Sequence, residues 1–279
     1  TNPESVEEGR HAVNLFDLAN VLNADAEVII KSLFVYNANP VIAVANQTKL
    51  IKQLKREDLF VVVSEIFHTD TCDYADIILP STSQLEQKDL MYSWGHFNIQ
   101  YNDMAIEPIG EAVSNSELFR RLAETFSFDD DDFKNDDEKI MSQAMKWDHK
   151  NMEGISLKSL QDIGFARLNV GDSKTRTPHQ YGMFPTETGK FEFVSSKPET
   201  GGQMLEVYRQ GVVDSKSYAP VDPLPSYVSN SIPENGYILI SPKHHQFLNS
   251  GYANFNLDNG QANEQIVMIN NIDAKAHEI

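Results

Sequence analysis

The sequence predicts an α/β fold with a Rossmann-like, open and mostly parallel sheet and flanking helices. Residues 59–63 form a continuous apolar run, β-branched at three positions and too short for a helix, which is typical of a strand buried on both faces. Residues 76–79 form a second short apolar run, which Pro80 ends. An amphipathic segment over 47–54 lies between an earlier apolar run and the first one, as in a parallel strand–helix–strand crossover.

The first part of the chain alternates between strands and helices. We expect a helix over 11–22, where apolar residues recur at near-helical spacing, and a first buried strand over 29–36. Residues 37–40 are expected to form the loop that leaves this strand. The helix over 47–54 then separates an apolar face from a face of lysines.

The loop after the central strand is the predicted ligand site. It covers residues 64–67 and leads to Thr69, whose hydroxyl is expected to cap a short helix through Ala75 by accepting a hydrogen bond from a first-turn amide. Asp76 is expected to order the turn into the next strand. In open α/β sheets, ligands bind outside the carboxyl ends of the strands, and this loop leaves such an end.

The middle of the chain is predicted to be mainly helical. Residues 81–98 carry few regular signals, and the aromatic Trp94, Phe97 and Tyr101 are expected to pack against the protein or to line a wall. Helices are predicted over 115–126 and over 156–164, the second ended by a glycine. The inner side of the first helix is expected to carry Leu118, Phe119, Leu122 and Phe126. The four aspartates of 129–132 lack the spacing of a calcium-binding EF-hand loop, so we interpret them as a solvated helix N-terminus.

The C-terminal part is richer in glycine and proline. Short strands are predicted over 189–194, 237–240 and 265–270. The expected division is an α/β domain over 1–165, a connecting excursion with a β-hairpin over 166–233, and the start of a further domain over 234–279.

Composition limits the classes of function. The chain of 279 residues has a formal net charge of −18, which argues against a nucleic-acid partner. It has no apolar run near the roughly 20 residues of a membrane span and no signal peptide pattern, so a cytoplasmic location is expected. Cys72, the single cysteine, cannot form an internal disulfide or a Cys-rich metal site, and is expected to be a small buried side chain.

Several polar residues are candidates for ligand binding. Glu65 ends the central strand with two carboxylate acceptors, which suit the paired N–H donors of a guanine edge or the hydroxyls of a ribose, at roughly 1.5–3 kcal/mol per charge-assisted bond. A solvated loop carboxylate is the alternative. Thr69 and Thr71 begin a helix whose amides can receive a phosphate or another polar group, or else they only cap it. Asn37 and Asn39 leave the first strand, where asparagine also serves simply as a turn residue.

A second candidate cluster lies in the C-terminal part. Lys243 and His244 follow the predicted strand over 237–240, and Asn249 and Ser250 come next. Adjacent histidines point to opposite sides of an extended chain, so the His pair is a poor joint metal ligand. A solvated or packed pair is the alternative. The sequence predicts no metal ligand and no catalytic residue.

Eight sequence pieces occur in an order typical of one protein family. They are Phe34–Pro40, Glu65–Thr71, Tyr74–Pro80, Leu85–Asp89, Pro108–Ala112, Asn115–Glu117, Phe184–Phe193 and Phe247–Ser250. With these pieces the chain resembles the molybdopterin oxidoreductases, the group that contains dimethyl sulfoxide reductase and formate dehydrogenase.

The resemblance implies a cofactor and a set of contact residues. It implies one of the two α/β domains that bind molybdopterin guanine dinucleotide, followed by the start of a C-terminal cofactor-binding β-barrel, which is truncated over 234–279. The residues implied to contact the cofactor are Asn37, Asn39, Pro40, Glu65, Phe67, Thr69, Lys243, His244, Asn249 and Ser250.

The resemblance also implies an activity. The whole enzyme would bind molybdenum through two pterin dithiolenes and perform two-electron redox or oxygen-atom transfer on a small-molecule substrate, with an electron-transfer subunit as a possible partner. The N-terminal part that supplies the metal ligand and any iron–sulfur cluster is expected to be missing, so the chain alone is predicted to be inactive. Two alternatives remain: a scaffold of this superfamily without cofactor, and an unrelated nucleotide-binding α/β protein.

Overall fold

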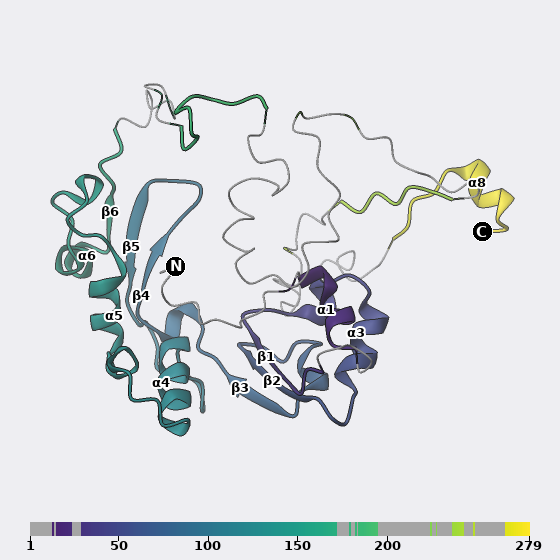
Figure 1. Ribbon diagram of the computed structural model, residues 1–279, viewed down its shortest axis with the longest axis horizontal. Coiled ribbons are helices and arrows are strands. Elements are labelled where there is room, and N and C mark those ends of the chain that lie inside the picture. The colour runs from purple at the N-terminus through teal and green to yellow at the C-terminus, as the bar shows by residue number, and fades with distance from the viewer. Residues whose placement is uncertain are drawn as a thin grey trace.

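The computed structural model contains two sheets with separate cores (Figure 1). One three-stranded sheet is parallel and the other is antiparallel. The structure describes residues 13, 15–23, 29–171, 179, 182, 184–194, 224, 227, 236–242, 248 and 266–279.

The parallel sheet confirms the predicted α/β fold. Its strands are β1 (Ser32–Tyr36), β2 (Phe60–Glu65) and β3 (Ile77–Pro80), in the order β1-β2-β3. The predicted apolar run is therefore the central strand, shifted only at its ends. Pro80 is the last residue of β3 rather than the residue after it, which is compatible with its missing N–H because β3 ends there.

Short helices cover one face of this sheet. They are α1 (Leu18–Val21), which follows a 3-10 turn at Leu15–Asp17, α2 (Pro40–Ala43) and α3 (Gln47–Leu54). The shared core contains Val35, Leu50, Leu54, Leu59, Val61 and Val63. Burial of one such side chain contributes roughly 1.5–3 kcal/mol, so this core holds the strands and helices together. The helix predicted over 11–22 is shorter than expected, whereas the helix predicted over 47–54 is confirmed.

The antiparallel sheet was not predicted. It consists of β4 (Asp89–Tyr92), β5 (Asn98–Asn102) and β6 (Phe165–Arg167), in the order β4-β5-β6. Its core contains Ile99, Met152 and Leu160, the last on helix α6 (Leu157–Ile163). That helix confirms the prediction over 156–164. It ends at Gly164, whose φ of 91° strongly favours glycine.

Helix α4 (Asn115–Thr125) lies between the two sheets in Figure 1. Ser114 caps it by accepting a hydrogen bond from the Glu117 amide at 3.3 Å. Its Phe119 ring contacts Tyr36 of β1, with 5.2 Å between the ring centres. Leu118 is buried as expected, but Phe126 is 65% exposed, so the predicted inner side is wrong at that end: Phe126 follows the last helical residue and stacks on Phe128.

The segment between β3 and α4 begins and ends at neighbouring positions beside β3. The Thr82 amide donates to the Val113 carbonyl at 3.1 Å, and the Val113 amide donates to the Pro80 carbonyl at 3.2 Å. Ser81 and Val113 thereby form a parallel bridge beside β3. The β4–β5 hairpin thus lies on an excursion whose two ends are adjacent.

The other short elements complete the description. Helix α5 (Asp137–Ala144) and helix α8 (Asn271–Ala276) are accompanied by 3-10 turns at Cys72–Tyr74, Gln84–Glu86, Asp131–Lys134 and Lys150–Met152. Asp129 and Asp131 lie in solvent and pair with Lys134 at 2.8 and 3.0 Å, in agreement with a solvated acidic turn. Among the described residues, no helix is long and apolar enough to cross a membrane.

Three strand predictions and one packing prediction differ from the structure. Residues 189–194 form bends and irregular chain, and residues 236–242 and 266–270 have no regular secondary structure. Short alternating runs make strands only where a partner strand pairs with them, and none is described there. The β-barrel start therefore stays a prediction. Trp94, expected to pack, is 99% exposed, because it lies at the turn of the β4–β5 hairpin.

Candidate functional site

The candidate site is the edge at which the parallel strands end, here called the carboxyl edge. Tyr36 of β1 is in register with Ser64 of β2, and Glu65 is in register with Pro80 of β3. The loops that follow these strands therefore leave the sheet side by side. This arrangement brings together the predicted residues of the first two loops, as the parallel order requires.

The loop after β1 carries three predicted site residues with different surroundings. Asn37 is exposed and has a φ of 51°, a left-handed conformation that asparagine tolerates. Asn39 is only 8% exposed, and its carbonyl accepts the first hydrogen bonds of α2, from the Ile42 and Ala43 amides. Pro40 is buried at the first position of α2, so its observed role is to start that helix.

A buried hydroxyl joins this loop to the next one. Thr71, which is 0% exposed, donates from Oγ1 to Asn39 Oδ1 at 2.6 Å. The same oxygen accepts from the Val41 amide at 3.2 Å. Thr71 precedes the 3-10 turn at Cys72–Tyr74, but its side chain makes no capping hydrogen bond, so the capping alternative for Thr71 is wrong. Its structural effect is to fix the β1 loop against the segment after β2.

The loop after β2 presents an acidic group beside apolar side chains. Glu65 is half-buried, and its Oε1 accepts a hydrogen bond from the Ile66 amide at 2.8 Å. No hydrogen bond engages Oε2 in the described part of the chain. Ile66 and Phe67 are 49% and 52% exposed. The loop therefore offers a carboxylate acceptor next to two apolar surfaces, as a planar polar ligand would require.

The predicted cap at Thr69 is wrong. The 3-10 helix begins only at Cys72, and the amides there donate to main-chain carbonyls. The Cys72 amide donates to the Thr69 carbonyl at 2.8 Å, and the Tyr74 amide donates to the Thr71 carbonyl at 3.2 Å. The Thr69 hydroxyl instead lies 3.6 Å from Cys72 Sγ. Cys72 is buried, as expected.

The expected role of Asp76 is confirmed. Its Oδ2 accepts from the Val61 amide at 2.7 Å, and its own amide donates to the Val61 carbonyl at 2.8 Å. The pair fixes the beginning of β3 against β2 and so helps to set the position at which both strands end.

Four of the predicted contacts lie outside the described residues. They are Lys243, His244, Asn249 and Ser250. Their placement at the carboxyl edge stays a prediction. Within the described residues, no group of three or more His, Cys, Asp or Glu side chains could hold a metal ion.

The third loop of the carboxyl edge, which follows β3, was not predicted as part of the site. Ser81 directly follows β3 and donates from its hydroxyl to Asn115 Oδ1 at 3.2 Å, which connects this edge to the start of α4. The rule that selected Glu65 and Asn39 would also have selected Ser81, because it too follows a parallel strand.

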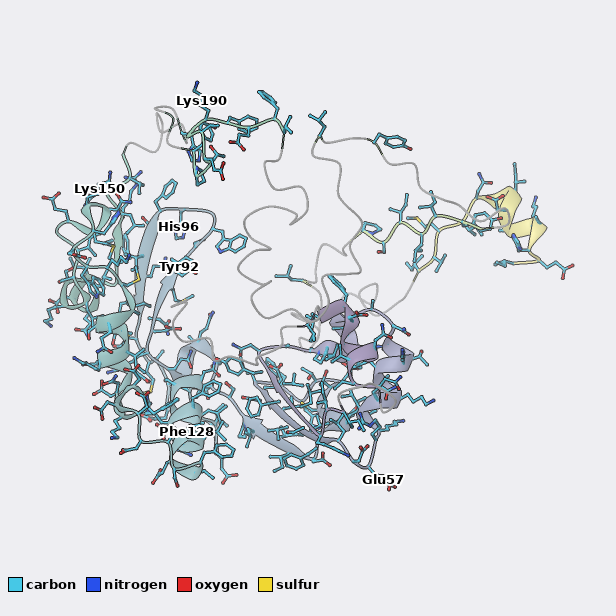
Figure 2. The ribbon with its side chains drawn as sticks, viewed as in Figure 1. Glu57, Tyr92, His96, Phe128, Lys150 and Lys190 are labelled. Carbon is cyan, nitrogen blue, oxygen red and sulfur yellow. The ribbon has the colours of Figure 1, made fainter. Side chains whose placement is uncertain are left out.

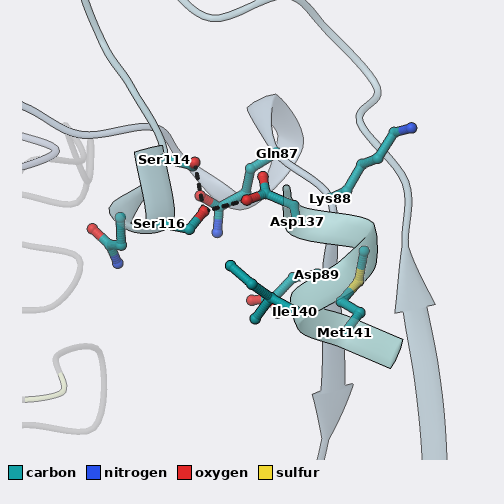
Figure 3. A pocket seen from close by; sticks show the side chains of 9 residues that line it. Gln87, Lys88, Asp89, Ser114, Ser116, Asp137, Ile140 and Met141 are labelled. Atoms are coloured by element: carbon teal, nitrogen blue, oxygen red, sulfur yellow. Dashed lines mark hydrogen bonds between the residues drawn. The ribbon is translucent and has the colours of Figure 1, made fainter. Parts of the chain in front are cut away.

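A small cavity of about 180 Å³ lies beside the start of α4 (Figure 3). Ser114, Ser116 and Asp137 form a hydrogen-bonded row on its wall, with 3.0 Å between the hydroxyls and 2.5 Å from Ser116 to Asp137. Arg120 also donates to Asp137 at 2.9 Å. These polar groups are satisfied by one another, so the row serves to join α4 to α5.

One buried carboxylate with a lowered pKa joins the segments before and after the β4–β5 hairpin. Glu86 is 7% exposed and accepts hydrogen bonds from the Ser83 and Ile109 amides, each at 2.8 Å. Hydrogen bonds from Ser83, then from Ile109, hold the pKa of Glu86 below its ordinary value, because they stabilise the charged form. It is a structural carboxylate and not part of the carboxyl edge.

Comparison with known proteins identifies the family. Residues 8–125, which contain the whole parallel sheet and its carboxyl edge, match the family model described as molybdopterin oxidoreductase. The chain belongs to the molybdopterin oxidoreductase family. This assignment confirms the resemblance found in the sequence and removes the alternative of an unrelated nucleotide-binding α/β protein.

Two relatives from Bacillus subtilis extend the similarity beyond the matched segment. The chain is 33% identical over 268 residues to "Probable oxidoreductase YoaE", covering 95% of this chain and 36% of that protein. It is 28% identical over 224 residues to "Probable oxidoreductase YyaE", covering 78% of this chain and 32% of that protein. The molybdopterin oxidoreductase chain thus spans about a third of the length of these relatives.

A solved structure shares the fold. The acetylene hydratase of Pelobacter acetylenicus aligns with a TM-score of 0.52 and 23% identity, over 80% of this chain and 27% of that one. At this identity the likeness concerns the fold alone. It agrees with a mixed α/β arrangement around a parallel sheet.

Proposed function

We propose that this molybdopterin oxidoreductase chain holds a molybdenum cofactor in its guanine dinucleotide form at the carboxyl edge. The observation that carries the proposal is the convergence of Asn39 and Glu65 at one edge of the parallel sheet, inside the segment that matches the family. Family membership supports the pterin; the choice of the guanine dinucleotide rests on the chemistry of the edge.

The donor and acceptor groups of the carboxyl edge suit a guanine. A guanine edge presents two neighbouring N–H donors, and Glu65 offers carboxylate oxygens that can accept from both. The Ile66 and Phe67 side chains next to it are half exposed and provide apolar surface for a planar ring. These two features together favour a purine–pterin dinucleotide over a free phosphate.

The chain's own residues bind and orient, whereas the cofactor carries the chemistry. When bound, the molybdenum centre would supply two-electron redox or oxygen-atom transfer. We also propose, following the family, that the holoenzyme receives a small-molecule substrate and exchanges electrons with a further redox centre or subunit. Because the cofactor would carry the chemistry, the isolated 279-residue chain without it is expected to have no turnover.

The decisive experiment compares two glutamates of the same region in the holoenzyme. Glu65→Ala is expected to lower molybdenum and pterin content by about tenfold, since one or two hydrogen bonds to the ligand are lost. Glu57→Ala is the control: Glu57 is exposed in the turn before β2, at the opposite end of the sheet (Figure 2). Both variants are expected to melt like the parent protein. Unaltered molybdenum content in Glu65→Ala would contradict the proposal, and a parent protein without molybdenum or pterin would support the scaffold alternative.

A further inference from the structure

We propose that Thr71 is a positioning residue that orients the Asn39 amide as a hydrogen-bond donor toward the cofactor. The inference rests on the proposed function and deepens it, because it assigns the kind of ligand atom that the β1 loop can recognise. Neither residue would act on the reacting atoms.

The orientation follows from the hydrogen-bonding capacity of one hydroxyl. The Val41 amide can only donate, so Thr71 Oγ1 must accept at that 3.2 Å contact. The hydroxyl oxygen could accept a second hydrogen bond, so the direction of the Asn39 contact is decided by the hydroxyl proton. Thr71 is 0% exposed and its hydroxyl contacts no other acceptor among the described residues, so this proton is donated to Asn39 Oδ1 at 2.6 Å. The Asn39 side chain therefore has its oxygen toward Thr71 and its Nδ2 on the opposite side.

The Nδ2 group is left for another partner. No hydrogen bond engages it, and Asn39 is not among the residues with further contacts. Within the described part of the chain, no fully buried side-chain polar atom lacks a partner, so Nδ2 reaches the surface although the residue is only 8% exposed. A nearly buried amide with two free donors at a ligand-binding edge is suited to bind an acceptor.

The two loops of the carboxyl edge then offer opposite hydrogen-bonding groups to a ligand. Glu65 presents acceptors after β2, whereas Asn39 presents donors after β1. The ligand would place N–H groups against Glu65 and a carbonyl, ring-nitrogen or phosphate oxygen acceptor against Asn39. Because the Thr71 hydroxyl connects the loops, it fixes both this arrangement of donors and acceptors and the spacing.

The test uses a substitution at Asn39 that keeps its buried hydrogen bond with Thr71. Asn39→Asp retains the oxygen that Thr71 contacts and replaces the outward Nδ2 donor by an acceptor. In the holoenzyme, we expect Asn39→Asp to lower the pterin bound per chain by about tenfold, a change that corresponds to one hydrogen bond of ordinary strength. Pterin is measured by fluorescence after release, beside the melting temperature. Pterin content equal to the parent would overturn the proposed orientation.

A second set of variants tests the positioning role. Thr71→Val removes the hydroxyl at constant shape and is expected to lower bound pterin by about tenfold, whereas Thr71→Ser restores it. Thr82→Val is the matched control, because Thr82 is also buried, at 4% exposure, and loses one hydrogen bond, to Gln87 at 2.7 Å, without contacting Asn39. Equal pterin in Thr71→Val and Thr82→Val, or no restoration by serine, would overturn the proposal.

The outcomes separate this inference from the proposed function. If Glu65→Ala loses pterin while Asn39→Asp retains it, only the role of Thr71 and Asn39 fails. If both variants retain pterin, the proposed function fails as well. If Thr71→Val does not fold, the comparison of Asn39→Asp with the parent and with Thr71→Ser still decides the question.

Discussion

The two sheets of this protein differ in where they place their side chains. The parallel sheet buries Val61 and Val63 fully, and its central strand ends in the polar pair Ser64 and Glu65. The antiparallel sheet buries Ile99 but exposes Tyr92 and, at its turn, the whole of Trp94; Figure 2 shows Tyr92 and His96 along the hairpin, far from the parallel sheet. In a parallel sheet covered by helices, the loops at the carboxyl edge are where ligands bind, and the polar groups of this edge form the candidate site.

The largest expected effect tests the covered face of the parallel sheet. Val63→Asp would place an unpaired charge in the core at a position with 0% exposure, which costs several kcal/mol, about 3–5, and is expected to abolish folding. Phe60→Asp on the same strand is the control, because Phe60 is 48% exposed, and it should cost less than about 1 kcal/mol. Urea unfolding of both variants provides the measurement. Equal stability of the two would show that β2 is not covered on one face.

A smaller effect is expected in the antiparallel core. Ile99→Ala removes a side chain that is 2% exposed and should lower the free energy of unfolding by about 2–5 kcal/mol. Tyr92, its register partner on β4, is 76% exposed, so Tyr92→Ala should change stability by no more than about 0.5 kcal/mol. A large loss for Tyr92→Ala would mean that another surface covers the hairpin.

The turn into β3 offers a more local test. Asp76→Ala leaves the Val61 amide without its side-chain acceptor and is expected to cost about 1–3 kcal/mol. Asp73→Ala removes a carboxylate of the same turn that is 65% exposed, and it should be nearly neutral, within about 0.5 kcal/mol. The parent protein is expected to have the highest unfolding midpoint, Asp73→Ala a nearly equal one, and Asp76→Ala the lowest. A reversed order would contradict the role assigned to Asp76.

The smallest expected effect is a dependence on pH. Because the pKa of Glu86 is held below its ordinary value by Ser83 and Ile109, the unfolded chain binds the proton more readily than the folded one. Its stabilising contribution is therefore complete above the ordinary pKa of glutamate and is lost as the pH falls through the lowered pKa of the folded state. Melting temperatures recorded between about pH 7 and about pH 3 should fall less steeply in Glu86→Gln than in the parent. Parallel curves would show that Glu86 does not contribute.

The sequence contained clear signals for the parallel sheet and weak ones for the other. The apolar run over 59–63 predicts a buried strand, and the single apolar face of 47–54 predicts a helix that packs on the sheet. Strand β2 and helix α3 confirm both predictions. In β5, the polar Asn98 and Gln100 alternate with larger side chains over only five residues, and β4 has only four residues without such alternation. β6 pairs with β5 although Gln100 and Phe165 lie far apart in the chain, and no local pattern specifies such a pairing.

The same limit applies to the candidate site. The positions of Asn39 and Glu65 follow from the rule that ligands bind where parallel strands end, so the sequence was sufficient to select them. The partner of the Thr71 hydroxyl could not be predicted, because Asn39 lies 32 residues away and the contact depends on the packing of two loops. At Thr69 the local capping rule was wrong, because main-chain carbonyls took the amides first.

The bridge between Ser81 and Val113 has a consequence for how this architecture can change. Since the hairpin excursion starts and finishes at neighbouring points, residues can be inserted or deleted within it without displacing the strands on either side. The β4–β5 hairpin with its exposed aromatic residues can therefore change in sequence and length while Asn39 and Glu65, which would bind the dinucleotide, keep their relative positions.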